Sequence, residues 1–136
     1  MSLVFADASY WIALSNPRDA YASQARLLSQ QFGETRVYTT EEVLTEFLNY
    51  FAGDKRLRRR AVEAAQGLLR NSRIIVVPQT HESFVEGLAL YAQRADKGYS
   101  LTDCISMQLI RREEIDAVLT SDHHFEQEGF RALLRG

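Results

Sequence analysis

Cysteine is nearly absent from this chain of 136 residues, which contains only Cys104. A single thiol cannot form an intramolecular disulfide, and it leaves no zinc site built from several cysteines. We therefore expect Cys104 to be a small buried side chain in a protein of the reducing cytoplasm.

Long apolar runs are also missing. Runs such as Leu3–Ala6 and Ile74–Val77 fall far short of the ~20 residues that a membrane-spanning helix needs. The N-terminus carries no basic segment before a signal-type apolar stretch, because Asp7 interrupts the first apolar run. The sequence thus predicts a soluble, cytoplasmic protein with no membrane attachment.

Positive charge is not in excess, since 16 lysine and arginine residues stand against 18 aspartate and glutamate residues and the net charge is −2. The overall charge therefore does not indicate a dedicated nucleic-acid binder. However, 14 of the 16 basic residues are arginine, and Arg56, Arg58 and Arg59 lie close together. Arginine forms forked contacts with phosphate, so these side chains are candidates for backbone contacts. The alternative, a solvated helix face, stays open.

The composition is otherwise that of a globular protein, with 46% hydrophobic, 10% aromatic and 25% charged residues. A chain of this length can bury one substantial core and is short for two. We therefore expect a single domain over residues 1–136.

Short apolar runs alternate with longer segments of helical periodicity. Strands are predicted at about 2–6, 36–39, 73–77, 116–121 and 131–134, and helices at about 8–14, 19–33, 40–52, 56–69, 80–98 and from 100 onward. This alternation predicts an α/β fold, a three-layer α/β/α sandwich around a mostly parallel sheet of about five strands. In such sheets a ligand binds outside the carboxyl ends of the strands, where the strand order reverses.

Two aspartates directly follow predicted strands. Asp7 comes after the first strand and Asp122 comes just past the fourth. If these two parallel strands are adjacent in the sheet, their carboxyl ends bring the two side chains close together. Each aspartate could instead be only a turn residue or a helix cap.

Two further acidic candidates belong to predicted helices. Asp103 lies in the first turn of its helix, where exposed N–H groups favour a carboxylate, so a purely capping role is a strong alternative. Glu46 lies in mid-helix between apolar neighbours. Glu42, one turn earlier on the same helical face, is a rival for the same role.

The four acids make chemical sense as a group. Oxygen ligands from several carboxylates select hard cations such as Mg²⁺ or Mn²⁺, which keep several waters and accept phosphate oxygens. Without a cation, clustered carboxylates repel one another and raise one another's pKa. We therefore predict a site for one or two divalent cations formed by Asp7, Asp103, Asp122 and one glutamate of the helix, Glu46 or its rival Glu42.

The order and spacing of these motifs resemble the PIN-domain family, especially the VapC-like toxins of toxin–antitoxin modules, over nearly the whole chain. Segment 5–9 looks like the family's opening strand, first acid and hydroxyl residue. Segment 43–48 resembles its helical glutamate motif, which favours Glu46 over Glu42. Segments 99–104 and 119–125 look like its third motif and its "T-x-D-x-x-F" fourth motif.

The resemblance implies an endoribonuclease that uses Mg²⁺ or Mn²⁺ and serves as the toxin of a type II toxin–antitoxin module. The four acids would be its catalytic and metal-binding residues, and Ser9 and Thr120 would support them by hydrogen bonding. The implied partners are an RNA substrate, a small antitoxin and a second copy in a homodimer. The RNA target stays open, as does direct contact between Asp122 and the ion.

Other residues near these motifs have two interpretations. His123 and His124 adjoin Asp122, and either could contact phosphate or metal, although a turn histidine without a metal role is the simpler assignment. Tyr10 and Trp11 could stack on an unpaired base, although core or dimer packing is simpler.

Two other functions are weighed against the nuclease. A haloacid-dehalogenase-like phosphohydrolase would also place an aspartate after the first strand, but it needs a second aspartate where this chain has Ser9. A PIN-fold module that binds RNA or protein without cutting is the alternative that the sequence leaves open.

Overall fold

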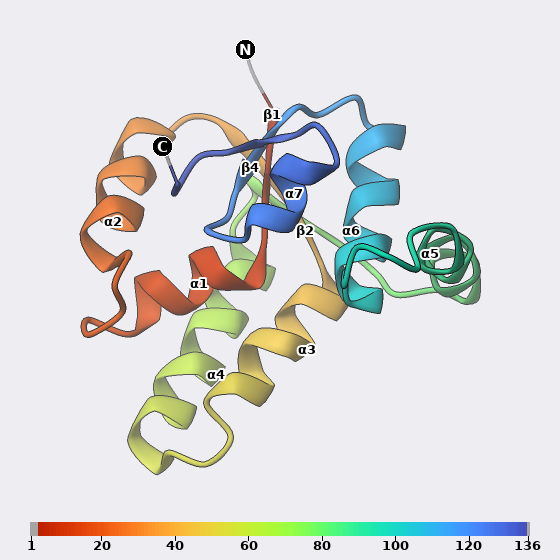
Figure 1. The fold of residues 1–136 in the computed structure, drawn as a ribbon. Coiled ribbons are helices and arrows are strands. Elements are labelled where there is room, and N and C mark those ends of the chain that lie inside the picture. Colours follow the sequence, from red (N-terminus) through yellow and green to blue (C-terminus); the bar gives the residue numbers. More distant parts are fainter. Residues whose placement is uncertain (1–2, 136) are drawn as a thin grey trace.

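A five-stranded sheet lies at the centre of the protein in the computed structural model, which describes residues 3–135 (Figure 1). The strands are β1 (Leu3–Ala6), β2 (Arg36–Thr40), β3 (Ile74–Val77), β4 (Ala117–Leu119) and β5 (Arg131–Ala132). The helices are α1 (Ala8–Ser15), α2 (Ala22–Gln31), α3 (Glu41–Tyr50), α4 (Lys55–Arg70), α5 (His81–Gln93), α6 (Leu101–Arg112) and α7 (His123–Gln127). Within residues 3–135, no helix has the length and apolarity that a membrane crossing requires.

The strands lie in the order β3-β2-β1-β4-β5, and every neighbouring pair is parallel. The predicted α/β fold with a parallel sheet is therefore confirmed. The chain moves from β1 through β2 to β3 and then returns to place β4 on the other side of β1. Helices α1 to α4 lie on one side of the sheet, and α5 and α6 lie on the other (Figure 1).

The strand order reverses between β1 and β4, where a ligand site is expected in sheets of this kind. Ala6 lies opposite Leu119, and the N–H of Asp7 donates to the carbonyl of Leu119 at 3.1 Å. The carboxyl ends of the two central strands thus end side by side, as the strand-end aspartates predict.

Core side chains fix the backbone beside two of the predicted acids, Glu46 and Asp103. Phe47 follows Glu46, Cys104 follows Asp103, and both are fully buried. Burying a large apolar side chain such as phenylalanine contributes about 1.5–3 kcal/mol. The neighbouring carboxylates are therefore held by segments that cannot move without opening the core. The predicted burial of Cys104 is confirmed.

Several predicted boundaries are wrong. The second helix begins at Ala22 rather than near Asp19, because the Asp19 carboxylate accepts from the N–H of Tyr21 at 2.9 Å and forms a turn. The fifth helix ends at Gln93 rather than at Gly98, which has φ +72° and lies in the connection that leads to α6. β4 ends at Leu119, and β5 is two residues shorter than predicted. Residue 2, predicted to begin the first strand, lies outside the described residues.

Gly87 lets α5 and α6 pack closely, and its substitution is expected to destabilise the fold. A Cβ at this position would lie 2.3 Å from Cγ1 of Ile105 and 3.2 Å from its backbone nitrogen. We expect Gly87→Ala to lower the free energy of unfolding by about 1–3 kcal/mol through overpacking, although alanine favours helix. Denaturant unfolding measures this change.

Gly67→Ala in α4 is the matched control. Among the described residues, no atom lies within 4 Å of a Cβ added there. This substitution should be neutral or stabilising by up to about 1 kcal/mol. Equal effects at the two positions would contradict the close approach of α5 and α6.

Candidate active site

A cleft of about 350 Å³ opens beside the carboxyl ends of β1 and β4, and all four predicted acids line it. Asp7 comes from the end of β1, Glu46 from α3, Asp103 from α6 and Asp122 from the start of α7. The other lining residues are Ala8, Ser9, Ile12, Tyr50, Gly98, Ser100 and His124. The fold therefore gathers carboxylates from four separate segments of the chain.

Asp7 is the most deeply buried of the four acids, with 4% of its surface exposed. Its Oδ2 accepts a hydrogen bond from Oγ1 of Thr120 at 2.8 Å and a longer one from Oγ of Ser9 at 3.4 Å. Its Oδ1 is buried and has no hydrogen-bond partner among the described residues. A buried carboxylate oxygen without a partner is unfavourable unless a proton or a cation satisfies it.

Ser9 and Thr120 form a hydroxyl bridge between the ends of β1 and β4. Their hydroxyl oxygens lie 3.1 Å apart, and each accepts a backbone N–H of the segment after β4. The N–H of Ser121 donates to Ser9 at 3.0 Å, and that of Asp122 donates to Thr120 at 3.0 Å. This bridge orients the Asp7 carboxylate and positions the backbone that carries Asp122.

Asp103 is held at the start of α6 by a reciprocal cap. Oγ of Ser100 accepts the N–H of Asp103 at 3.0 Å, and Oδ2 of Asp103 accepts the N–H of Ser100 at 3.1 Å. The capping role is therefore present, and the same carboxylate also lines the cleft. One residue can serve both purposes because a carboxylate has more acceptor positions than one N–H occupies.

Glu46, rather than Glu42, faces the cleft. Oε2 of Glu42 accepts a hydrogen bond from Oγ of Ser83 at 3.0 Å, at the start of α5. The two glutamates share a helical face in sequence, but the packing of α5 directs them to different surroundings.

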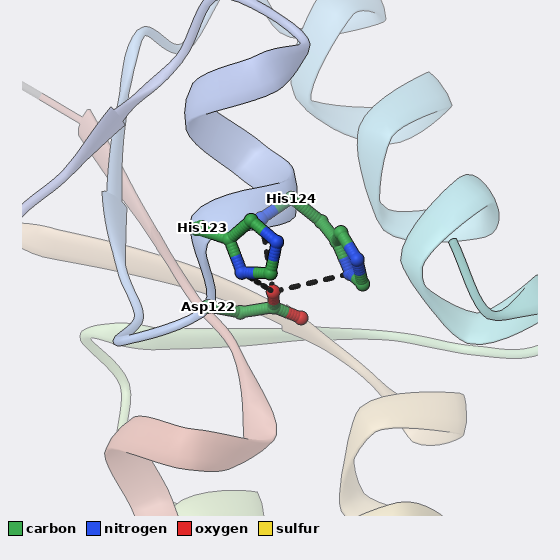
Figure 2. Close-up of side chains that lie close together, drawn as sticks. All are labelled: Asp122, His123 and His124. Carbon is green, nitrogen blue, oxygen red and sulfur yellow. Dashed lines mark hydrogen bonds and ion pairs between the residues drawn. The ribbon is translucent and has the colours of Figure 1, made fainter. Parts of the chain in front are cut away.

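Asp122 carries two histidines beside it (Figure 2). It caps α7, because its Oδ1 accepts the N–H of His124 at 2.9 Å. Nδ1 of His124 lies 3.1 Å from the same oxygen and 3.5 Å from Oδ2 of Asp103, whereas Nδ1 of His123 lies 3.8 Å from Oδ1 of Asp122. The predicted turn histidines therefore lie in the first turn of α7, and His124 joins the cleft.

Burial and mutual repulsion act on three of the acids. Burial, with repulsion from Asp103 as the next largest cause, raises the pKa of Asp7 from 3.8 to about 7. Burial followed by Asp103 and Asp122 raises the pKa of Glu46. Burial also raises the pKa of Asp103, while the Ser100 hydrogen bonds and His124 oppose the rise. The cluster therefore resists full ionisation in the absence of a counter-charge.

These residues fit a divalent cation. The donor set is dominated by carboxylate oxygens, which suit Mg²⁺ and Mn²⁺. Oδ1 of Asp7, for which the described residues offer no hydrogen-bond donor, is an oxygen that a cation would satisfy. Positive charge in the cleft would also relieve the repulsion among the acids.

Comparison with protein families adds an independent observation. The family model of the PIN domain matches residues 4–130 of this chain. The chain belongs to the PIN domain family. The matched residues include all four acids of the cleft. The prediction of family membership made from the motifs is confirmed.

A solved structure also resembles this PIN domain. The crystal structure of the Mycobacterium tuberculosis toxin VapC20, described as cleaving the sarcin-ricin loop, superposes with a TM-score of 0.84 at 26% identity. The match covers 93% of this chain and 95% of that chain. The resemblance to VapC-like toxins therefore extends over the whole fold. The comparison with curated proteins found no significant match.

Aromatic residues of the PIN cleft differ from the sequence-based candidates. Tyr10 and Trp11 are buried, with Nε1 of Trp11 donating to Oγ1 of Thr39 at 3.2 Å, so their packing interpretation is confirmed. Tyr50 lines the cleft with 60% of its surface exposed, and its ring meets that of Phe51 edge to face at 5.0 Å. Its position at the end of α3, one turn after Glu46, was a signal that could have found it.

Removing the Thr120 hydroxyl is expected to weaken metal binding. Thr120→Val keeps the side-chain shape but removes both the bond to Asp7 and the acceptor for the N–H of Asp122. Loss of a partner that orients a ligand typically lowers metal affinity about 10–100-fold. Calorimetric titration with Mn²⁺ measures the change. Thr120→Ser keeps the hydroxyl and serves as the control; equal affinity in both variants would contradict the orienting role.

Proposed function

We propose that this chain is a metal-dependent endoribonuclease and the toxin of a type II toxin–antitoxin module. The observation that carries the proposal is the cleft of four acids, in which buried Asp7 keeps one oxygen without a partner among the described residues. Membership of the PIN family and the fold shared with a VapC toxin support it. The catalytic and metal-binding residues of the proposal are Asp7, Glu46, Asp103 and Asp122.

Each side chain has a task that follows from its place. A divalent cation held by carboxylates lowers the pKa of a bound water and stabilises charge on phosphate oxygens. Asp7 and Asp103 would hold the cation, since they are the most buried acids and each has one oxygen fixed by hydrogen bonds. Glu46, half-buried across the cleft, and Asp122 would complete the set and position the attacking water.

The proposed substrate is RNA. The VapC20 toxin is described as cleaving the sarcin-ricin loop. For this chain we propose cleavage of a phosphodiester bond in an RNA loop, where unpaired bases can be stacked on exposed aromatic side chains. Tyr50 at the cleft is the aromatic residue placed for this contact.

The test of this function is cleavage of labelled RNA by the purified protein. We expect cleavage in Mg²⁺ or Mn²⁺, loss of cleavage in excess chelator, and recovery when either ion is restored. Binding of RNA without products under all of these conditions would instead favour the PIN-fold module that does not cut.

The resemblance to VapC toxins also supports two protein partners. We propose a small antitoxin that holds the toxin in check and a homodimer of this chain, both in the cytoplasm. Co-purification with the product of a small neighbouring reading frame, and molecular mass in solution, are the corresponding measurements.

Arginines on α4 are proposed to bind RNA phosphates, and their replacement should weaken binding. Arg56, Arg58 and Arg59 are exposed, and Arg58 also donates to the carbonyl of Ala52 at 3.0 Å. Replacing all three with glutamine should reduce the slope of log affinity against log salt by about 1 for each phosphate that the variant no longer binds. Filter binding with a non-cleaving variant measures the slope.

Arg70→Gln is the matched control, since Arg70 is an exposed arginine in the last turn of the same helix. An unchanged salt slope in the triple variant would assign the three arginines to a solvated helix face.

A further inference from the structure

His124 occupies an unusual position for a histidine of a short helix. Its side chain is 22% exposed, and its Nδ1 is buried without a hydrogen-bond partner among the described residues. This nitrogen faces two carboxylates: Oδ1 of Asp122 at 3.1 Å, which Figure 2 shows, and Oδ2 of Asp103 at 3.5 Å. The N–H direction is not aligned on either oxygen, so the contacts are not explained as hydrogen bonds.

The two distances that involve Nδ1 of His124 each fit a pair of ligands of one ion. Metal bonds from histidine nitrogen and carboxylate oxygen are roughly 2.0–2.2 Å long. Two such ligands at a right angle therefore lie about 3 Å apart, and at a tetrahedral angle about 3.5 Å apart. The distances from His124 to Asp122 and Asp103 match both values.

Neighbouring residues hold the imidazole in this place. The ring meets that of Tyr99 at 5.3 Å, and the Tyr99 hydroxyl donates to Oε1 of Glu128 at 2.9 Å. The backbone N–H of His124 is fixed by Asp122. A ligand that is oriented before the ion arrives loses little conformational freedom on binding.

His123 does not share these features. Asp122, His123 and His124 form a group whose ligating atoms all lie within 4.8 Å of one another. However, the side chain of His123 is 55% exposed. Three consecutive residues gather partly because they are consecutive, whereas the approach of His124 to Asp103 joins two separate helices.

We propose that His124 is a nitrogen ligand of the catalytic cation, together with Asp103 and Asp122, and makes the site prefer transition-metal ions to Mg²⁺. The inference rests on the proposed metal-dependent nuclease. Imidazole nitrogen suits transition-metal ions, while Mg²⁺ selects oxygen. A site of carboxylates alone would lack this preference.

The experiment uses Mn²⁺ as the probe on the whole protein. Electron spin echo measurements of bound Mn²⁺ detect a ligating ¹⁴N directly, without an activity readout. We expect ¹⁴N coupling in the wild type and in His123→Asn, and none in His124→Asn. Calorimetry should show that His124→Asn lowers Mn²⁺ affinity about 10-fold or more and leaves Mg²⁺ affinity nearly unchanged.

Two results would overturn the inference: bound Mn²⁺ without ¹⁴N coupling in the wild type, or an equal loss of Mn²⁺ and Mg²⁺ affinity in folded His124→Asn. The wild-type spectrum tests for the nitrogen ligand even if His124→Asn does not fold. Chelator-sensitive RNA cleavage by a protein that shows no ¹⁴N coupling would leave the proposed function standing and remove only the nitrogen ligand.

Discussion

Asp7→Asn is expected to lower RNA cleavage by about 10³-fold or more, because it removes the negative charge of the most buried of the proposed metal ligands. The same substitution should stabilise the metal-free protein at pH 8. Asparagine can still accept the hydrogen bond from Thr120, and it carries no charge into the buried cluster. Activity and stability should therefore move in opposite directions.

The pH dependence of this effect follows from the raised pKa. Because the pKa of Asp7 is about 7 in the fold and 3.8 otherwise, the folded state retains a proton that the unfolded chain has lost. The stability of the chelated wild type should thus fall as pH rises from 3.8 to about 7 and then level off. The full difference corresponds to about 4 kcal/mol.

Denaturant unfolding in chelator between pH 4 and pH 8 measures this effect for the wild type and for Asp7→Asn. Glu42→Gln is the matched control, because Glu42 bonds to Ser83 and lies outside the cleft. Undiminished cleavage by folded Asp7→Asn would show that Asp7 is not one of the catalytic residues. If the stability of Asp7→Asn depended on pH in the same way as that of the wild type, the buried charge of Asp7 would not be the cause of the pH dependence.

Glu128→Ala is expected to produce the second large effect, a loss of about 2–4 kcal/mol in the free energy of unfolding at pH 7. The side chain of Glu128 is 5% exposed. It accepts hydrogen bonds from Arg94, Arg111 and Tyr99. The expected loss is smaller than for a fully buried ion pair, because solvent screens the partners: the side chains of Arg94 and Arg111 are 31% and 41% exposed.

Acid should reduce the difference between wild type and Glu128→Ala. The hydrogen bond from Arg94, as the largest cause, lowers the pKa of Glu128 from 4.5 to about 2, and the hydrogen bond and charge of Arg111 act in the same direction. The stabilisation is therefore complete above pH 4.5 and is lost as pH falls through about 2. Glu126→Ala is the control, since its ion pair with Arg135 is exposed. Equal losses at the two positions would contradict the buried network.

Local sequence patterns were sufficient for the elements that carry the acids. Apolar strands followed directly by Asp7 and Asp122 predicted their place at the sheet edge, because parallel strands end on the same side. Ser100, as a cap just before the next apolar positions, marked the helix of Asp103. The prediction of helix ends was wrong where a side chain stabilised a turn just outside the helix, as Asp19 does before α2.

Contacts between distant segments could not be predicted from local patterns. Periodicity places Glu42 and Glu46 on one helical face, and only the resemblance to the PIN family favoured Glu46. The hydrogen bond from Ser83, which holds the Glu42 side chain away from the cleft, depends on how α5 packs. The approach of His124 to Asp103 likewise depends on the packing of α7 against α6.

The proposed catalytic cluster of four acids is tested most directly by a crystal soaked in Mn²⁺ and measured for anomalous scattering. We predict a peak in the cleft with oxygen atoms of Asp7 and Asp103 at roughly 2.0–2.3 Å, including the Asp7 oxygen that has no hydrogen-bond partner among the described residues. A peak that touches neither carboxylate, or an empty cleft in a crystal of the active protein at saturating Mn²⁺, would contradict the proposed metal site.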